Sequence, residues 1–324
     1  MAHPPVSICL VTYNRARLLP QTIDSLLSQS FSDFELIISD DFSTDETEEI
    51  CNEYAQKDER IRYKRNSKNL GMPGNLNASL QIASGVYLAN LHDGDIYRED
   101  LIICWKDALD KNPTTGFVFN AYRVRQPNGT SQIYRESYPE LIPGRTLGQR
   151  LLSRWDSCVF GTVMTRRSVY EKIGWFDPQF GNYSDVDMWL RIARDYDVSY
   201  VNKPLMELMP GDSSRFYAFV HWKVVFWLLG IHIINLQRYE AILPEFFVLM
   251  MKKYPIRKRF FMFRNMLTCI KHRRWDRVRE GFAIWSSADD YVLRNLGRCF
   301  KREHNTPDWY KDCKNYWWDM VHSI

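Results

Sequence analysis

The chain has few cysteines, and their arrangement argues against both disulfides and a structural zinc site. The 324 residues include seven cysteines, an odd number, and none forms a Cys-x-x-Cys pair. Scattered cysteines of this kind are typical of reduced thiols in a cytosolic protein. The N-terminus has no basic segment followed by an apolar one, so no signal peptide is predicted. We therefore expect a cytoplasmic protein.

Excess charge and long apolar runs are also scarce. Lysine and arginine number 43 against 39 acidic residues, and the resulting net charge of +4 is too small to predict nucleic-acid binding. The apolar stretch over residues 224–236 is shorter than the roughly 20 residues that span a bilayer. No internal repeat or low-complexity segment occurs. The hydrophobic content of 45% allows a substantial core, in one large domain or in a domain with an appendage.

What the sequence does contain is a series of short apolar runs that alternate with helical patterns. Residues 6–12 form a continuous apolar run, typical of a parallel strand covered on both faces. Apolar residues at helical spacing follow over 18–27, and 34–39 is a second strand, so the chain begins with a β-α-β unit. Further strands are predicted at 61–63, 86–91, 116–124, 159–164 and 198–201, and helices from 43 or 44, over 76–83, 101–109, 146–152 and 168–173, and from 181.

Polar residues follow several of these strands. Thr12-Tyr-Asn14 ends the first, Asp40-Asp41 ends the second, and Asp93-Gly-Asp95 ends a later one. The carboxyl ends of parallel strands meet at one edge of a sheet, where ligands bind. Two carboxylates on either side of a glycine can point the same way from a turn, and such oxygen ligands suit Mg²⁺ or Mn²⁺ carrying a diphosphate. Asp-Gly-Asp is also common turn chemistry, so its surroundings decide its meaning.

The composition changes after residue 212. Basic clusters alternate with large apolar residues over 252–302. A helix of this composition can lie on an anionic membrane surface, and a solvated helical bundle packed on the first domain explains the pattern equally well. We predict two domains, residues 1–212 and a C-terminal helical, basic and aromatic region over 213–324.

Five motifs in order resemble those of the family-2 GT-A glycosyltransferases, inverting enzymes that take a sugar from a nucleotide diphosphate donor. The motifs are Val6–Asn14, Ser39–Asp45, Asn69–Gly71, Leu91–Asp95 and Ser184–Arg191. Each is modest evidence alone, and their order and spacing make the resemblance specific over about residues 5–210. It implies the α/β GT-A fold, a mostly parallel Rossmann-like sheet with helices on both faces, and a catalytic role for residues 1–212.

The resemblance also implies a nucleotide site. Asp41 would accept a hydrogen bond from N3–H of uracil or thymine, and Tyr13 would pack against the base. Thr12 and Asn14 would line the same pocket. Asn77 would either help to cover the base or only pack its helix.

The later motifs imply a metal-binding site and a catalytic base. Asp95 would bind the metal, and Asp93 would contact the ribose or share the ion, which would neutralise the departing diphosphate as a Lewis acid. Asp185 would be the catalytic base, since inversion needs a carboxylate that takes the acceptor hydroxyl proton. Ser184 stands where a glutamate is usual. Asp187 is therefore an alternative candidate for the catalytic base, although we expect it to have a structural role. The structural alternative for Asp185 is that it only caps the N-terminus of its helix.

The residues after the last predicted strand also depart from the family pattern. Many relatives have a histidine there, and this chain has none between Glu207 and Arg215. Arg215 or His221 could supply compensating charge, and phosphate and water could equally complete the metal shell. Trp175 and Phe176 could form the floor of the sugar site.

The resemblance therefore implies a metal-dependent glycosyltransferase of surface polysaccharide biosynthesis, in the cytoplasm or peripherally at the inner face of the cell membrane. Its cofactor would be Mg²⁺ or Mn²⁺, its donor a UDP-, dTDP- or GDP-sugar, and its acceptor a glycan or polyprenyl-linked glycan. Loops such as 126–145 would face the acceptor.

Three alternatives compete with this interpretation. A glycoside hydrolase also uses two carboxylates but needs no Asp-x-Asp motif. A nucleotidyltransferase would normally have a glycine- and lysine-rich loop after its first strand, which residues 12–16 do not provide. A non-catalytic sugar- or lipid-binding module would not need to retain Asp41, Asp93, Asp95 and Asp185 together.

Overall fold

The computed structural model describes residues 4–209 except 127, 155, 156 and 160, together with residues 231, 232, 235, 238, 239, 242, 243 and 245. The chain divides into two compact units, Met1–Pro210 and Gly211–Ile324. All named strands and helices lie in the first unit. The helical region predicted over 213–324 falls largely outside the described residues.

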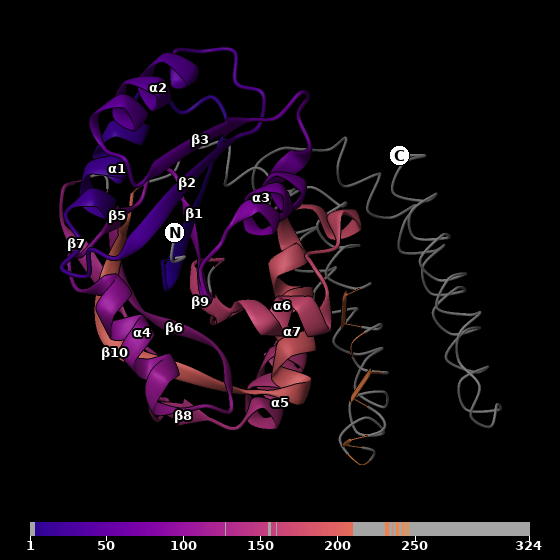
Figure 1. The fold of residues 1–324 in the computed structure, drawn as a ribbon. Helices are drawn as coiled ribbons and strands as arrows, with labels where there is room; N and C mark the ends of the chain where they lie inside the picture. The colour runs from indigo at the N-terminus through magenta and orange to yellow at the C-terminus, as the bar shows by residue number, and fades with distance from the viewer. Residues whose placement is uncertain are drawn as a thin grey trace, which may run out of the picture. The chain divides into compact units, whose positions relative to one another are not determined.

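A single ten-stranded sheet forms the centre of the first unit (Figure 1). Its main path runs β3-β2-β1-β4-β9-β6-β10-β5, with β7 paired to β6 and β8 paired to β10. The strands are β1 (Val6–Thr12), β2 (Phe34–Asp40), β3 (Ile61–Arg65), β4 (Tyr87–His92), β5 (Ile96–Tyr97), β6 (Thr115–Arg125), β7 (Ser131–Tyr134), β8 (Leu141–Ile142), β9 (Val163–Arg166) and β10 (Asp197–Leu208).

Helices cover both faces of the sheet (Figure 1). They are α1 (Leu19–Leu27), α2 (Thr47–Lys57), α3 (Gly71–Ile82), α4 (Leu101–Lys111), α5 (Gly144–Arg154), α6 (Arg167–Ile173) and α7 (Ser184–Asp195), with a short 3-10 helix at Pro178–Tyr183. Helices α1, α2 and α4 pack in one core with β1, whereas α3 packs on β1 and β2, and α6 and α7 pack on β9 and β6. The predicted α/β fold is thus confirmed.

Strand direction decides which strand ends meet. Strand β1 pairs in parallel with β2 and with β4, and β6 pairs in parallel with β10. Strand β9 lies between β4 and β6 and is antiparallel to both. Because two reversals restore the direction, β4 and β6 run the same way, and the carboxyl ends of β1, β2, β4 and β6 share one edge of the sheet.

The continuous apolar run of β1 has the two-sided burial that the sequence predicts. All seven of its residues are buried. Val6, Ile8 and Leu10 belong to the core shared with α1, α2 and α4. Successive side chains of a strand point to opposite faces, so Cys9 faces the other layer, where it contacts Ser79 of α3.

Several predicted boundaries are wrong. Helix α2 begins at Thr47 rather than at 43 or 44, because the Asp45 carboxylate accepts hydrogen bonds from the Thr47 backbone N–H (3.2 Å) and hydroxyl (2.6 Å) and holds a turn before the helix. Helix α3 begins at Gly71 rather than at 76, since Pro73 is tolerated in a first helical turn. Strand β9 begins at 163 rather than 159.

The structure also contains strands that the sequence did not predict. Strands β5 and β8 have two residues each, too short for a recognisable pattern. All four residues of β7 are exposed, so no apolar alternation marks them. Strand β10 continues to Leu208, beyond the predicted end at 201, across two irregularities in its pairing with β6.

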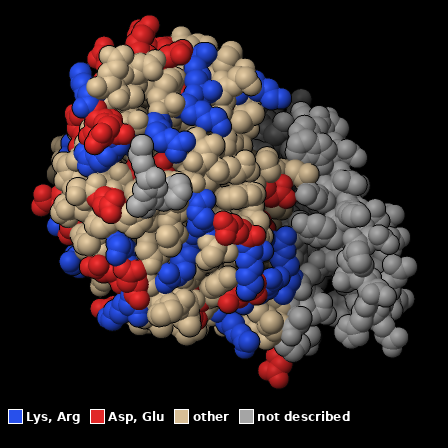
Figure 2. All heavy atoms as spheres, viewed as in Figure 1, with Lys and Arg blue, Asp and Glu red and all other residues tan. Residues whose placement is uncertain are grey.

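On the face drawn in Figure 2, described lysine and arginine side chains are interspersed with aspartate and glutamate. On that face, positive and negative side chains are therefore mixed and not separated into one basic and one acidic patch. Among the described helices, none combines the length and the apolar character that crossing a lipid bilayer requires.

Candidate active site

The predicted site residues come from the shared carboxyl edge of β1, β2 and β4. Thr12 is the register partner of Asp40, and Val11 is the partner of His92. The residues that follow these strands, Tyr13, Asp41 and Asp93, therefore begin loops at the same edge.

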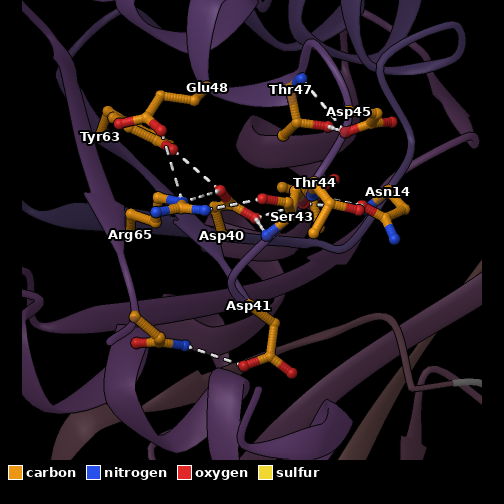
Figure 3. Close-up of polar contacts among 12 residues, drawn as sticks. Asn14, Asp40, Asp41, Ser43, Thr44, Asp45, Thr47, Glu48, Tyr63 and Arg65 are labelled. Carbon is orange, nitrogen blue, oxygen red and sulfur yellow. Dashed lines mark hydrogen bonds and ion pairs between the residues drawn. The ribbon is translucent and has the colours of Figure 1, made fainter. Parts of the chain in front are cut away.

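Asp40 and Asp41 have different environments (Figure 3). The Asp40 carboxylate is fully buried, accepts hydrogen bonds from the Ser43 backbone N–H (3.0 Å) and the Tyr63 hydroxyl (2.9 Å), and lies 3.6 Å from Arg65 Nε. These contacts connect β2 to β3 and to the loop after β2. Asp40 is therefore an internal anchor of the sheet edge.

Asp41 points away from that group (Figure 3). Its Oδ1 accepts hydrogen bonds from Asn66 Nδ2 (3.1 Å) and from the Leu70 backbone N–H (2.8 Å), and its own N–H donates to the Thr12 carbonyl (3.0 Å). Its Oδ2 accepts no hydrogen bond within the part of the chain that the structure describes. The side chain is thus held firmly with one oxygen left to bind a donor group.

The loop after β1 is fixed to the loop after β2. Asn14 has a positive φ of 51°, its N–H donates to Ser43 Oγ (2.9 Å), and its Oδ1 accepts from the Thr44 N–H (2.8 Å). Tyr13 is 46% exposed at this rim. Thr12 is buried, and its Oγ1 has no hydrogen-bond partner among the described residues.

Asn75 is a further site residue that the sequence analysis missed. Its buried amide donates to the carbonyl of Ser39 (2.9 Å) and more weakly to that of Thr12 (3.4 Å), and accepts from Ser39 Oγ (2.7 Å) and Asn66 Nδ2 (2.9 Å). It therefore ties α3 to the ends of β1 and β2 and positions the partner of Asp41. The available signal was its spacing of four from Ser79, which marks a polar pair on one buried helix face.

Both polar atoms of the Asn77 side-chain amide form hydrogen bonds with the backbone of Phe176. Its Nδ2 donates to the Phe176 carbonyl (2.8 Å), and its Oδ1 accepts from the Phe176 N–H (3.0 Å). Phe176 itself is buried against Tyr170 and Trp189, so it belongs to the core rather than to the floor of a sugar site. These contacts account for Asn77 as a packing residue, and its predicted contact with a base stays a prediction.

The Asp93-Gly94-Asp95 turn is anchored to α1. Gly94 has a φ of 82°, a conformation that L side chains rarely adopt. The Thr22 hydroxyl accepts from the Gly94 N–H (3.0 Å) and donates to the Asp95 carbonyl (2.9 Å). The Asp95 side chain is buried, and that of Asp93 is half-buried. The turn therefore has a fixed backbone at the end of β4, with one carboxylate residue on either side of Gly94.

The donor chemistry of this turn fits a divalent cation that is bound together with a phosphate. Two carboxylates supply hard oxygen ligands of the kind Mg²⁺ and Mn²⁺ prefer. Among the described residues, no group of three histidine, cysteine, aspartate or glutamate side chains could hold a metal on its own. Asp93 and Asp95 are the residues of this turn that would hold such an ion.

Asp185 lies beside His92, the last residue of β4, although the two residues are far apart in the sequence. A methyl group added at Gly161 would lie 2.7 Å from His92 Cε1 and 3.9 Å from Asp185 Oδ2, so both side chains border the same small space. Asp185 is in the first turn of α7, where its Oδ1 accepts from the Val186 N–H (2.8 Å). Removal of water by the surrounding protein raises the pKa of Asp185 to about 7.

Asp187 faces a different set of partners. Its Oδ2 accepts from Arg191 Nε (2.8 Å) in a buried ion pair. The same guanidinium donates to the carbonyls of Ile173 (3.0 Å) and Trp175 (2.8 Å). Asp187 thus fixes α7 to the preceding segment, and of the two carboxylates Asp185 is the one placed beside β4. Arg215 and His221 lie outside the described residues.

Comparison with known proteins shows which family the chain belongs to. The profile described as "Glycosyl transferase family 2" matches residues 7–174. The chain belongs to this glycosyl transferase family. Family membership makes the chain an enzyme of glycosyl transfer, so neither a hydrolase nor a nucleotidyltransferase.

Similar proteins of this family come from several organisms. An uncharacterized glycosyltransferase of Methanocaldococcus jannaschii is 26% identical over 270 residues, covering 76% of this chain and 92% of the relative. A Campylobacter jejuni protein named GalNAc(5)-diNAcBac-PP-undecaprenol beta-1,3-glucosyltransferase is 39% identical over 93 residues, covering 28% of this chain and 30% of the relative.

A solved structure shares the fold. Residues 1–349 of S. aureus TarS in complex with UDP-GlcNAc superpose with a TM-score of 0.54 at 16% identity, covering 87% of this family-2 chain and 92% of the TarS chain. At that identity the likeness concerns the fold alone.

Proposed function

We propose that this family-2 enzyme is an inverting glycosyltransferase that moves a sugar from a UDP- or dTDP-linked donor to a glycan acceptor on a lipid carrier. The observation that carries the proposal is the position of Asp185 beside His92, the last residue of β4, which the Asp93-Gly94-Asp95 turn follows. This position supports the assignment of Asp185 as the base for the acceptor and of Asp93 and Asp95 as the carboxylates on the donor side. The Campylobacter relative, whose name includes a lipid-diphosphate acceptor, supports the acceptor class.

Donor binding begins at Asp41. Its Oδ2 is available to accept a hydrogen bond from N3–H of uracil or thymine, while Oδ1 is held by Asn66 and Leu70. Tyr13, exposed at the same rim, offers its ring to the face of the base. Asp93 and Asp95 would hold Mg²⁺ or Mn²⁺, which when bound neutralises the charge of the leaving diphosphate.

Asp185 acts on the acceptor. Its carboxylate takes the proton of the acceptor hydroxyl while the hydroxyl oxygen forms a bond to the anomeric carbon and the bond from that carbon to the diphosphate oxygen breaks. A general base works best when its pKa lies near the working pH, and the pKa of about 7 raised by burial meets this condition. Attack from the side opposite the diphosphate inverts the anomeric centre.

A panel of nucleotide sugars tests this proposal. UDP-, dTDP- and GDP-linked sugars are incubated with the full chain and Mg²⁺ or Mn²⁺, and the released nucleoside diphosphate is measured. We expect release from a uridine or thymidine donor, and loss of that release with a chelator. Release from GDP-sugars alone would contradict the role of Asp41, and release that survives chelation would contradict the metal.

A further inference from the structure

The β6–β7 hairpin presents a pair of stacked tyrosines. Tyr122 and Tyr134 are cross-strand partners, and their rings lie 5.2 Å apart at an interplanar angle of 6°. Tyr122 is half-buried, whereas Tyr134 is 39% exposed. The outer ring of the pair is therefore held flat by the inner one and remains open to a ligand.

Strand register places this pair near the candidate active site. Tyr122 is the register partner of Met206 on β10, and Met206 is also the partner of Tyr97 on β5. Tyr97 in turn exchanges hydrogen bonds with the backbone of His92 through its hydroxyl, at 2.9 Å each. One strand thus separates Tyr122 from the strand that follows the Asp93-Gly94-Asp95 turn, a lateral distance of about 10 Å.

A second connection runs through the segment before β9. The Tyr138 hydroxyl lies 3.7 Å from Cys158 Sγ, and the Tyr138 ring packs edge-on against Tyr200. Cys158 is close in sequence to Gly161, which borders Asp185. Three residues of chain span at most about 10 Å, so the segment from Cys158 to Gly161 connects the neighbourhood of Tyr138, four residues after Tyr134, with that of Asp185.

We propose that Tyr134, held against Tyr122, is the platform on which a pyranose ring of the acceptor glycan stacks. This inference rests on the proposed function and assigns it an acceptor-binding residue. A pyranose has a face of C–H groups and a rim of hydroxyls, and a tyrosine offers it a flat apolar face with a polar tip at low entropic cost.

The surroundings of the platform favour a sugar over the hydrocarbon of a lipid carrier. The exposed neighbours on the hairpin include Ser131, Gln132 and Arg135, which offer hydrogen bonds to a hydroxyl rim. Ser131 donates to Glu207, which also pairs with Arg125 at 2.8 Å, so the strand that carries the platform is fixed to β10. A hydrocarbon chain would need a continuous apolar surface, whereas Gln132, the strand residue that shares a face with Tyr134, is polar and accepts a hydrogen bond from the Tyr134 hydroxyl (3.2 Å).

Glycan binding by two variants tests the platform. The full chain, Tyr134→Ala and Tyr134→Phe are applied to an array of immobilised oligosaccharides. We expect the parent to bind a subset of these glycans, Tyr134→Ala to lose about three- to tenfold in affinity for them, and Tyr134→Phe to retain it because the ring face is kept. Tyr134 is exposed on a short strand, so its replacement leaves the core intact.

Ile133→Ala is the matched control. Ile133 is the adjacent residue of β7, is 43% exposed, and points to the opposite face of the hairpin, so its replacement should leave glycan binding unchanged. Equal glycan affinity of Tyr134→Ala and the parent would overturn the platform. So would a parent that binds no glycan on the array, whether or not it binds vesicles containing undecaprenyl phosphate. Donor-dependent nucleotide release without acceptor should be the same in Ile133→Ala and the parent, and its absence in the parent would instead refute the proposed function.

Discussion

Asp40 and Asp41 are adjacent residues of the same type, and their neighbours give them different tasks. Tyr63, Ser43 and Arg65 surround the Asp40 carboxylate, whereas Asp41 keeps Oδ2 available. The sequence predicts that carboxylates follow β2 but not which of them is internal, because both follow the same apolar run. The choice depends on residues of β3 and of the loop after β2.

Asp185→Asn should abolish sugar transfer and preserve donor binding. The amide keeps the shape of the side chain but cannot take the acceptor proton, and loss of a general base costs about a hundredfold to ten-thousandfold in rate. Transfer rate and donor affinity are measured on the same preparation. A transfer rate equal to that of the parent would remove the base assignment.

The pH dependence of transfer offers an independent measurement. Asp185 must be deprotonated to act as a base, so the rate of the parent should rise with pH through about 7, the pKa to which burial raises this carboxyl. The rate is recorded from pH 5 to 9 at saturating donor and acceptor. A rate that is constant from pH 5 to 7, while chemistry limits turnover, would contradict a base with this pKa.

Asp95→Ala should weaken donor binding in the presence of Mg²⁺ or Mn²⁺ and change it little in their absence. The substitution removes one of the two carboxylates that we propose as metal ligands at the end of β4. Asp33→Ala is the control, since it removes the same charge from an exposed loop before β2. An equal loss of affinity with and without the metal would show that Asp95 acts in some other way.

At the scale of elements, α3 joins the nucleotide side of the site to the sheet through Asn75. Its amide contacts groups from β1, β2 and the loop after β3, all of them buried. The helix was predicted from its apolar residues, and its role as a connector was not, because the hydrogen bonds of one buried asparagine depend on elements distant in sequence. For the same reason Asp185 could be proposed as a site residue from the sequence only by family resemblance.

Asn75→Ala should lower the free energy of unfolding by about 1–3 kcal/mol, because Ser39 and Asn66 would be left with unsatisfied buried polar groups. Asn52→Ala, an exposed position of α2, is the control and should change stability little. Urea unfolding of both variants measures the difference. A stability of Asn75→Ala equal to that of the parent would mean that other groups or water replace the lost bonds.

At the scale of the whole unit, the opposite edge of the sheet is held by Glu35. Burial acts to raise the pKa of this carboxyl, and hydrogen bonds from Ser7, Ser84 and Arg62 outweigh it and lower the pKa to about 2. The Glu35 carboxylate thereby links β1, β2 and β3 to the segment before β4. The apolar strands of this sheet were predictable, whereas this link was not, since a glutamate at the start of a strand has no distinctive pattern.

Stability should therefore fall in acid. A depressed carboxyl pKa contributes stability above its unfolded value of about 4.5, and this stability is lost as pH falls towards about 2, to a limit of roughly 3 kcal/mol. Glu35→Gln should reduce the loss between pH 5 and 2 in urea unfolding. Glu59→Gln, at an exposed position, is the control. The same acid dependence in Glu35→Gln and the parent would assign the effect to other carboxylates.

The reversed direction of β9 has a consequence for how the enzyme can diversify. The segment that enters β9 touches Tyr138 through Cys158 and borders Asp185 at Gly161. Lengthening this segment by one residue would displace the neighbours of Tyr138 and of Asp185 at the same time. The β6–β7 hairpin is instead fixed to β10 through Ser131 and Glu207, so, with Tyr134 as the proposed platform, substitutions on this hairpin would change glycan recognition and leave the neighbours of Asp185 in place.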